Sequence, residues 1–137
     1  MSAYQDIHSA LNQSLIDLDL GVDIAFEGQN FDPKNIAGTI FISENFSYNQ
    51  QESLSKNTLD EITGIYQLSV CQRTGLGVAP VLTIVDQIID NYEHNAKFTS
   101  GDQTVVIINS GRGSARMIDS WYIVDISVLF KSDKLRA

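Results

Sequence analysis

The order of hydrophobic and polar positions changes sharply near the middle of the chain. Between Gly64 and Cys71, large apolar side chains fall on every second position, which is the period of a strand buried on one face. After Thr74-Gly75-Leu76-Gly77, apolar residues recur at helical spacing, and Pro80 suits the first turn of a helix. This stretch therefore predicts a half-buried strand, a tight turn and an amphipathic helix that ends in the polar residues 91–95.

The rest of the chain predicts one more helix and four more strands. Apolar residues spaced by three or four mark one face of a helix from Tyr4 to Leu18, and Gly21 ends it. Period-two patterns or apolar runs predict the strands, which are Val22–Phe26, Gly38–Phe46, Gln103–Asn109 and Ser120–Lys131. Gln103–Asn109 is apolar on both sides, so we expect it to be central or covered.

Several polar segments carry neither period. Ser47–Leu59 and Ser110–Arg116 are predicted to be long exposed loops, and such loops in compact domains are usually functional or mobile. Gly28–Ile36 is predicted to be a loop because it contains a proline, and Phe98–Asp102 to be a turn. Residues 131–137 form a polar tail that we expect to fray.

The order of these elements predicts an α+β fold. Two helices pack on one face of a mainly antiparallel sheet of about five strands. The chain has 137 residues, of which 43% are hydrophobic, so residues 1–137 suit one domain of ordinary size.

The last predicted strand has apolar residues on both faces. Tyr122, Val124 and alternate residues after them form one face, while Trp121, Ile123 and Leu129 lie on the other. Three large apolar side chains are unusual on a face open to solvent. We expect part of this second face to be covered, either by an element of this chain or by a neighbouring subunit.

Charge is distributed unevenly along the chain. The net charge is −8, and residues 1–61 carry ten acidic residues and two lysines, whereas residues 62–137 carry seven residues of each sign. The chain lacks the clustered Lys and Arg that grip a nucleic-acid backbone directly. The acidic half is interpreted as a solvated face; the alternative is a patch that meets a basic partner or binds divalent cations at a subunit boundary.

Cysteine content and hydropathy indicate the compartment. The single Cys71 cannot form an internal disulfide, and residues 1–20 do not resemble a signal peptide. No apolar run approaches the roughly 20 residues that span a bilayer. The sequence therefore predicts a protein of a reduced, cytosolic setting that does not enter a membrane.

Two glycine-rich segments suggest phosphate binding. Gly75-Leu76-Gly77 precedes a helix, whose first N–H groups attract anions, but it lacks the third glycine of a dinucleotide fingerprint and the Lys-Ser/Thr end of a P-loop. We interpret it as a tight turn. Gly111-Arg112-Gly113 also suggests phosphate binding, and we interpret it as a mobile basic loop.

The candidate metal ligands and nucleophile are weak. His8 and His94 are far apart and are interpreted as solvated helix histidines, while Asp17, Asp19 and Asp23 lack the spacing of an EF-hand loop.

Cys71, the single cysteine of the chain, is a candidate nucleophile. Arg73 close by in sequence would lower the pKa of the Cys71 thiol, but no histidine lies nearby to act as a base. We interpret Cys71 as a bystander.

Taken together, the segments resemble the tail-terminator-like proteins of long-tailed bacteriophages. They occur in the family's order and at about its spacings across nearly the full chain. The segments are Ala10-Leu11, Ile24 to Pro33 (IAFEGQNFDP), Thr63 to Val70 (TGIYQLSV), Gly75-Leu76-Gly77 with Ala79, Asp86-Gln87-Ile88, and Trp121 to Val128 (WYIVDISV).

The resemblance implies a structural virion protein without enzyme activity. Proteins of this kind form a hexameric ring on the head-proximal end of the tail tube, stop tube polymerisation and present a surface for head-tail joining. The implied partners are further copies of the chain, the tail-tube protein, a head-completion or stopper protein and, non-specifically, viral DNA in the lumen. No cofactor or membrane is implied, and assembly would take place in the host bacterial cytoplasm, with a divalent cation favouring the ring.

Two alternatives stay open at this point. One is another neck or tail-tube component of a virion. The other is a small soluble ligand-binding domain or enzyme that uses one of the glycine-rich segments, which would require a pocket with convergent polar groups.

The candidate site residues lie on the second face of the last predicted strand and in the two polar loops. Ring contacts are expected at Trp121, Ile123 and Leu129 together with a sheet edge, since a closed ring needs two different complementary patches. The two polar loops are expected to contact partners or DNA, and six copies of their arginines would form a basic collar; the alternative is that both loops are simply mobile. The residues in question are Gln50, Gln51, Glu52, Arg112 and Arg116.

Overall fold

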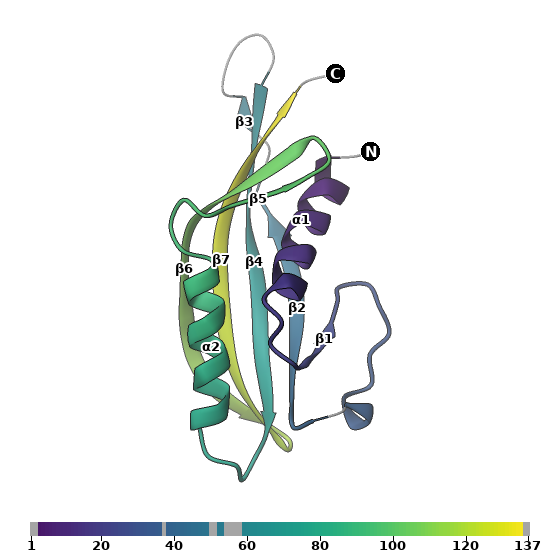
Figure 1. The fold of residues 1–137 in the computed structure, drawn as a ribbon, viewed down its shortest axis with the longest axis vertical. Helices are drawn as coiled ribbons and strands as arrows, with labels where there is room; N and C mark the ends of the chain where they lie inside the picture. The colour runs from purple at the N-terminus through teal and green to yellow at the C-terminus, as the bar shows by residue number, and fades with distance from the viewer. Residues whose placement is uncertain (1–2, 37, 50–51, 54–58, 136–137) are drawn as a thin grey trace.

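A computed structural model describes residues 3–36, 38–49, 52–53 and 59–135 of the chain. Within these ranges, two α-helices and a short 3-10 helix accompany seven strands of one sheet (Figure 1). The elements are α1 (Ala3–Asp17), β1 (Asp23–Ala25), η1 (Pro33–Asn35), β2 (Ile40–Tyr48), β3 (Glu52–Ser53), β4 (Leu59–Arg73), α2 (Ala79–Asn91), β5 (Lys97–Ser100), β6 (Gln103–Ile118) and β7 (Trp121–Leu135).

The sheet is mixed but mainly antiparallel. Its strand order is β1-β2-β4-β7-β6-β5, with β3 paired to β4 off this path. Only β1 with β2 is a parallel pair among the pairs of described strands. The predicted α+β class is confirmed, and the sheet has two more strands, β3 and β5, than the apolar pattern indicated.

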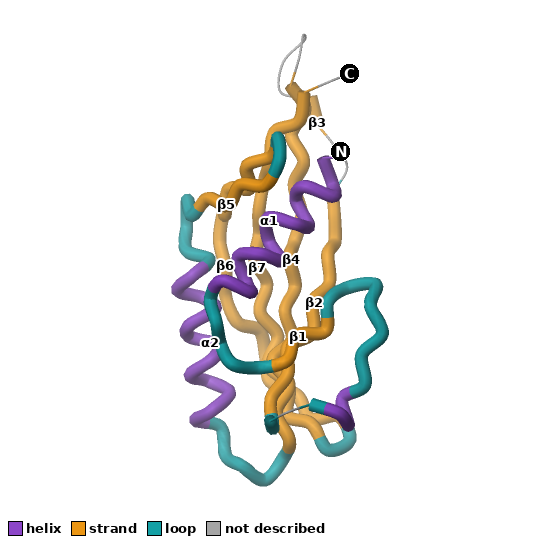
Figure 2. Tube along the Cα trace, turned by 45° about the vertical axis from the view of Figure 1, so that its right-hand side comes forward, coloured by secondary structure: helices purple, strands orange, loops and turns teal. Residues whose placement is uncertain are grey.

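Both helices pack on the same face of the sheet, as predicted (Figure 2). The apolar faces of α1 and α2 meet alternate residues of the long central strands β4 and β7, because side chains on every second strand position point to one face. The core-facing residues of these two strands are fully buried, namely Ile62, Tyr66, Leu68, Val70, Val124, Ile126, Val128 and Phe130.

The polar segment 47–59 is not wholly a loop, which corrects the sequence-based expectation. β2 continues to Tyr48, β3 covers Glu52–Ser53 opposite Asp60 and Glu61, and β4 already begins at Leu59. The predicted partner residues Gln50 and Gln51 lie outside the described residues. Main-chain hydrogen bonds to the neighbouring strand hold these strand ends, so a strand forms here without an apolar period in the sequence.

The expected fraying tail is corrected for the same reason. β7 runs to Leu135, which lies opposite Leu59, so residues 131–135 are paired with the first part of β4. The turn expected at Phe98–Asp102 is also partly strand, because β5 occupies Lys97–Ser100. In each case the partner strand, rather than local hydrophobicity, sets the length of the element.

The expected loop Ser110–Arg116 is part of the long strand β6, which pairs with β7 up to Ile118. Register shifts occur between Ile107 and Asn109 and between Arg112 and Ala115. These bulges and glycines break the alternation that identifies a strand in the sequence. The segment 103–109 is flanked by β7 and, over its first four residues, by β5, and Val105 and Ile107 are fully buried, as expected for a covered strand; Ile108 is exposed.

Candidate assembly surfaces

The sheet face opposite the helices is largely polar. We call it the open face. Register places three cross-strand rows on it, and these rows are Ser43, Ser69 and Asp125; Asn45, Gln67 and Ser127; and Ser47, Ile65 and Leu129. Its centre therefore combines polar side chains, of which Asp125 is charged, with one apolar pair, Ile65 and Leu129.

One end of the open face is covered from within the chain. Ile123 packs with Phe41 and Cys71 in a small second core, and Phe31 and Ile36 from the segment around η1 pack against it. Ile123 is only 9% exposed. This segment has no periodic pattern, so the sequence did not show that it folds back over the sheet.

Trp121 belongs to the same cover, whereas Leu129 does not. The Trp121 ring contacts the edge of Phe41, with centroids 4.9 Å apart, and the guanidinium of Arg73 lies 4.9 Å from the Trp121 centroid. Leu129 is 37% exposed and lies opposite Ile65. Of the three predicted ring-contact residues, Leu129 is therefore the one with a large exposed apolar side chain.

The two arginines near the β6–β7 hairpin lie on opposite faces of the sheet. Arg112 is opposite Ile126, whose side chain is in the main core, while Arg116 is opposite Ile123 on the open face. Arg116 binds Asp125 through Nε and Nη2, at 3.1 and 3.2 Å. The two side chains do not project from one mobile loop, and the charge of Arg116 is paired.

The two long edges of the sheet differ. No described strand pairs with the outer side of β6 from Asn109 to Ile118. On the opposite side, the Glu27 carboxylate accepts a hydrogen bond from the Phe46 N–H at 2.5 Å, next to the stretch of β2 that pairs with β1. Unpaired strand edges are natural sites for pairing with another chain, and the β6 edge is the more open of the two.

A buried carboxyl group lies under α1. Glu44 accepts a hydrogen bond from the Tyr66 hydroxyl at 2.5 Å and one from the Glu27 N–H at 3.2 Å. With its amide nitrogen facing Glu44, Asn12 of α1 donates to both carboxyl oxygens, at 2.8 and 2.7 Å. Burial raises the pKa of Glu44, the hydrogen bonds from Tyr66 and the Glu27 N–H lower it in part, and the Glu27 charge raises it. This network ties α1, β2 and β4 together.

The two histidines are not both solvated, which corrects the earlier interpretation. His8 stacks on Phe46 with ring centroids 3.7 Å apart, and burial lowers its pKa against the opposing effect of the Glu27 charge. His94 is exposed in the turn after α2, and its Nδ1 lies 2.7 Å from the Ile108 carbonyl oxygen.

The environment of Cys71 also differs from the expectation. The thiol is buried, and burial together with the nearby Asp125 charge raises its pKa to about 11, against a lowering by Arg116. The expected lowering by Arg73 is wrong, because the guanidinium of Arg73 lies over Trp121.

The turn that precedes α2 is confirmed. Gly75 and Gly77 have φ of 93° and 77°, which favour glycine, and the Gln72 side-chain Nε2 donates to the Gly77 carbonyl at 2.5 Å. Val78 at the N-cap provides no side-chain hydrogen bond.

In the part of the chain that the structure describes, no three His, Cys, Asp or Glu side chains gather to hold a metal ion. Neither helix among the described residues combines the length and apolar character needed to cross a bilayer.

Comparison with known proteins identifies relatives of the chain. Residues 6–130 match the model of the family described as phage tail terminator protein. Thirteen chains of solved structures also match; one has a TM-score of 0.75 at 15% identity, and the alignment covers 100% of this chain and 98% of that one. At such low identity this likeness shows the fold alone. A comparison with curated proteins found no match.

Proposed function

The chain belongs to the phage tail terminator protein family, and we propose that it closes the head-proximal end of a tail tube as a ring of identical subunits. Membership makes it a structural protein of a bacteriophage tail and a component of the virion. The observation that carries the proposal is the family match over residues 6–130, together with a fold that leaves the β6 edge from Asn109 to Ile118 unpaired among the described strands and Leu129 exposed on the open face. The proposed role is one of assembly, without catalysis.

The ring contacts are assigned to two unlike surfaces. A closed ring requires that each subunit offers two different complementary patches. We assign these two patches to the β6 edge from Asn109 to Ile118 and to the open face around Ile65 and Leu129. Six copies is the number proposed, with Trp121 and Ile123 shaping the neighbouring surface from within the subunit. A divalent cation is proposed to favour the ring.

The two ends of the tall sheet are proposed to meet different partners. The strands β3, β4 and β7 extend past α1 at one end, and the β6–β7 hairpin closes the other (Figure 1). One end would meet the tail-tube protein and stop its polymerisation, and the other a head-completion or stopper protein. Glu52 belongs to the first end, where β3 pairs with β4.

Contact with viral DNA in the lumen is proposed to be non-specific. Arg116 is paired with Asp125, whereas the Nε of Arg112 donates to the carbonyl of the neighbouring Gly113, and no ion pair of Arg112 is found among the described residues. A basic collar would therefore depend mainly on Arg112, and its attraction to phosphate would weaken as salt rises.

The test is the mass of the protein in solution, measured by analytical ultracentrifugation at several concentrations with and without Mg²⁺. The expected result is one discrete ring, which Leu129→Asp dissociates while helix content is retained. Ile16→Asp, at another exposed apolar residue, is the matched control and should leave the ring intact. Ile123→Asp is unsuitable, because it would disrupt the contacts with Phe41 and Cys71.

Two outcomes would contradict the proposal. A protein that stays monomeric at high concentration under both conditions would not be a ring subunit. Growth into long tubes would instead indicate a tail-tube subunit, since such a subunit polymerises end to end.

A further inference from the structure

We propose that neighbouring copies of this chain are oriented by a charge contact, in which acidic side chains along α2 of one copy meet two lysines on the open face of the next. The partner is thus a second copy, which presents α2 together with its β6 edge. The inference rests on the proposed function, because it names the charged part of the same ring contact.

The exposed side of α2 is acidic and has no basic residue to balance it. Asp86 and Asp90 are exposed and lie one helical turn apart, and Glu93 follows just after the helix. Like charges four residues apart on a helix repel each other, and acidic groups near its C-terminal end oppose the helix dipole. No ion pair of these three acids is found among the described residues. This arrangement is unfavourable within one subunit, so a cationic partner would stabilise it.

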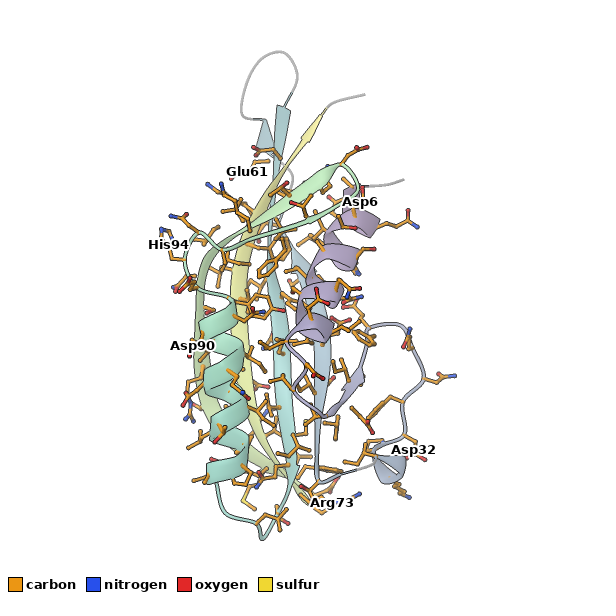
Figure 3. The ribbon with its side chains drawn as sticks, in the orientation of Figure 1. Asp6, Asp32, Glu61, Arg73, Asp90 and His94 are labelled. Atoms are coloured by element: carbon orange, nitrogen blue, oxygen red, sulfur yellow. The ribbon has the colours of Figure 1, made fainter. Side chains whose placement is uncertain are left out.

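These acids lie on the side of the molecule that carries the unpaired β6 edge. In both ribbon views α2 runs beside β6 (Figure 1 and Figure 2). Figure 3 shows Asp90 on the side of α2 that faces away from α1. A neighbour that packs on the β6 edge from Asn109 to Ile118 would therefore also meet the acids of α2.

The open face carries positive charge directly beside its apolar pair. Lys131 lies two residues beyond Leu129 on β7, so both side chains point to the same face. Lys131 and Lys97 belong to one cross-strand row, with Val106 between them. Both lysines are exposed and line a pocket of about 490 Å³, and neither forms an ion pair with a described residue. An incoming carboxylate therefore has room to reach them.

The charges nearest to the apolar pair in the register are these two lysines. The row on the other side of the pair, which contains Gln67 and Ser127, is uncharged. Glu61 and Asp133 lie one row beyond the lysines. An acidic surface of the neighbour would complement the lysines, and the β6 segment 109–118 cannot supply it, because it contains two arginines and no acid. The α2 acids supply the charge that the β6 edge lacks, and such complementarity fixes the orientation of a contact.

The test reverses one charge on each side of the contact and measures mass by analytical ultracentrifugation. Asp90→Lys places like charge against Lys131, and Lys131→Glu places like charge against the acids of α2. Each variant alone should need at least tenfold more protein than wild type to assemble, because like charges across an interface repel. An equimolar mixture of the two variants should assemble again, since every contact in an alternating ring then joins opposite charges. An alternating ring requires an even number of subunits, as in the proposed hexamer.

Two further variants control for net charge. Asp17→Lys and Lys34→Glu change the net charge by the same amounts at exposed positions on α1 and η1. Both should assemble as wild type does. Circular dichroism should show the same helix content in all four variants, because every changed side chain is exposed.

Three outcomes would overturn the inference while a wild-type ring leaves the proposed function standing. One is that Asp90→Lys or Lys131→Glu assembles as well as wild type, or better. Another is that the mixture stays dissociated. The third is that the two control variants fail in the same way, which would show an effect of net charge alone. A wild-type protein that forms no ring would instead refute the proposed function, and this contact with it.

Discussion

The Asp6 carboxylate in α1 lies against Gly101 in the turn between β5 and β6, and its Oδ2 accepts a hydrogen bond from the Asp102 N–H at 3.3 Å. Figure 3 shows Asp6 near the N-terminal end of α1, close to this turn. Asp6 is 2% exposed, although it is an acidic residue. A carboxylate in the first turn also suits the positive end of the helix dipole. This contact joins the first helix to a hairpin far along the chain.

Gly101→Ala should destabilise the protein through this contact. A Cβ at position 101 would lie 2.6 Å from Asp6 Oδ2, and the residue has φ of +58°. We expect the free energy of unfolding, measured by urea denaturation, to fall by about 1–3 kcal/mol. Gly111→Ala is the matched control, because a Cβ there meets nothing within 4 Å. A loss of equal size in both variants would contradict the role of the Asp6 contact.

Glu44→Gln should change how stability depends on pH. Burial raises the pKa of Glu44, so the folded state binds its proton more tightly than the unfolded state does. The resulting stabilisation is fully present below the unfolded pKa of about 4.3 and is lost as pH rises through the folded pKa. Relative to wild type, the glutamine variant should therefore become more stable as pH rises through this window, by about 1.4 kcal/mol for each unit of difference between the two pKa values.

Tyr66→Phe provides the companion measurement for Glu44. The Tyr66 hydroxyl donates to Glu44, and its removal takes away an effect that lowers the pKa of Glu44. We expect the loss of stability with rising pH to extend to higher pH in this variant. Urea denaturation at a series of pH values measures both effects, and parallel curves for all three proteins would refute them.

Arg116→Ala and Arg112→Ala should differ in stability. Arg116 forms a two-point ion pair with Asp125, but its side chain is 48% exposed, so solvent screens the pair. We expect a cost of at most about 1 kcal/mol for Arg116→Ala, reduced at high salt. Arg112→Ala should cost less, because no ion pair of Arg112 is found among the described residues. Thermal unfolding at low and high salt distinguishes the two variants.

Cys71 should react slowly with thiol reagents in the folded protein. The thiol is buried and its pKa is raised to about 11, so little thiolate is present near neutral pH. We expect labelling by iodoacetamide at about pH 8 to be at least tenfold faster in denaturant than in buffer. Ser47→Cys in a Cys71→Ser background places a thiol at an exposed position and should react rapidly in both states. Rapid labelling of native Cys71 would show that the cover formed by Phe31 and Ile36 opens readily.

The sequence by itself determined those helices and strands whose buried face shows as a regular spacing of apolar residues. The helical spacing of apolar residues placed both helices, and the alternation from Tyr66 to Val70 and from Tyr122 to Phe130 identified the two central strands and their core faces. The glycines at 75 and 77 marked the turn, because a positive φ is a local property of the chain. These features gave the fold class, since each depends only on neighbouring residues.

Only the tertiary structure decided how far the strands extend and which surfaces stay open. The polar ends of β4, β6 and β7 are strands because a partner lies alongside, and pairing leaves no apolar period in the sequence. Ile123 became core rather than surface because an irregular segment with Phe31 and Ile36 folds over it. Likewise, the unpaired Gln72 oxygen exists because the turn at Gly77 takes up the amide nitrogen of the same side chain. Such long-range contacts depend on the arrangement of the whole chain, and no local pattern in the sequence indicates them.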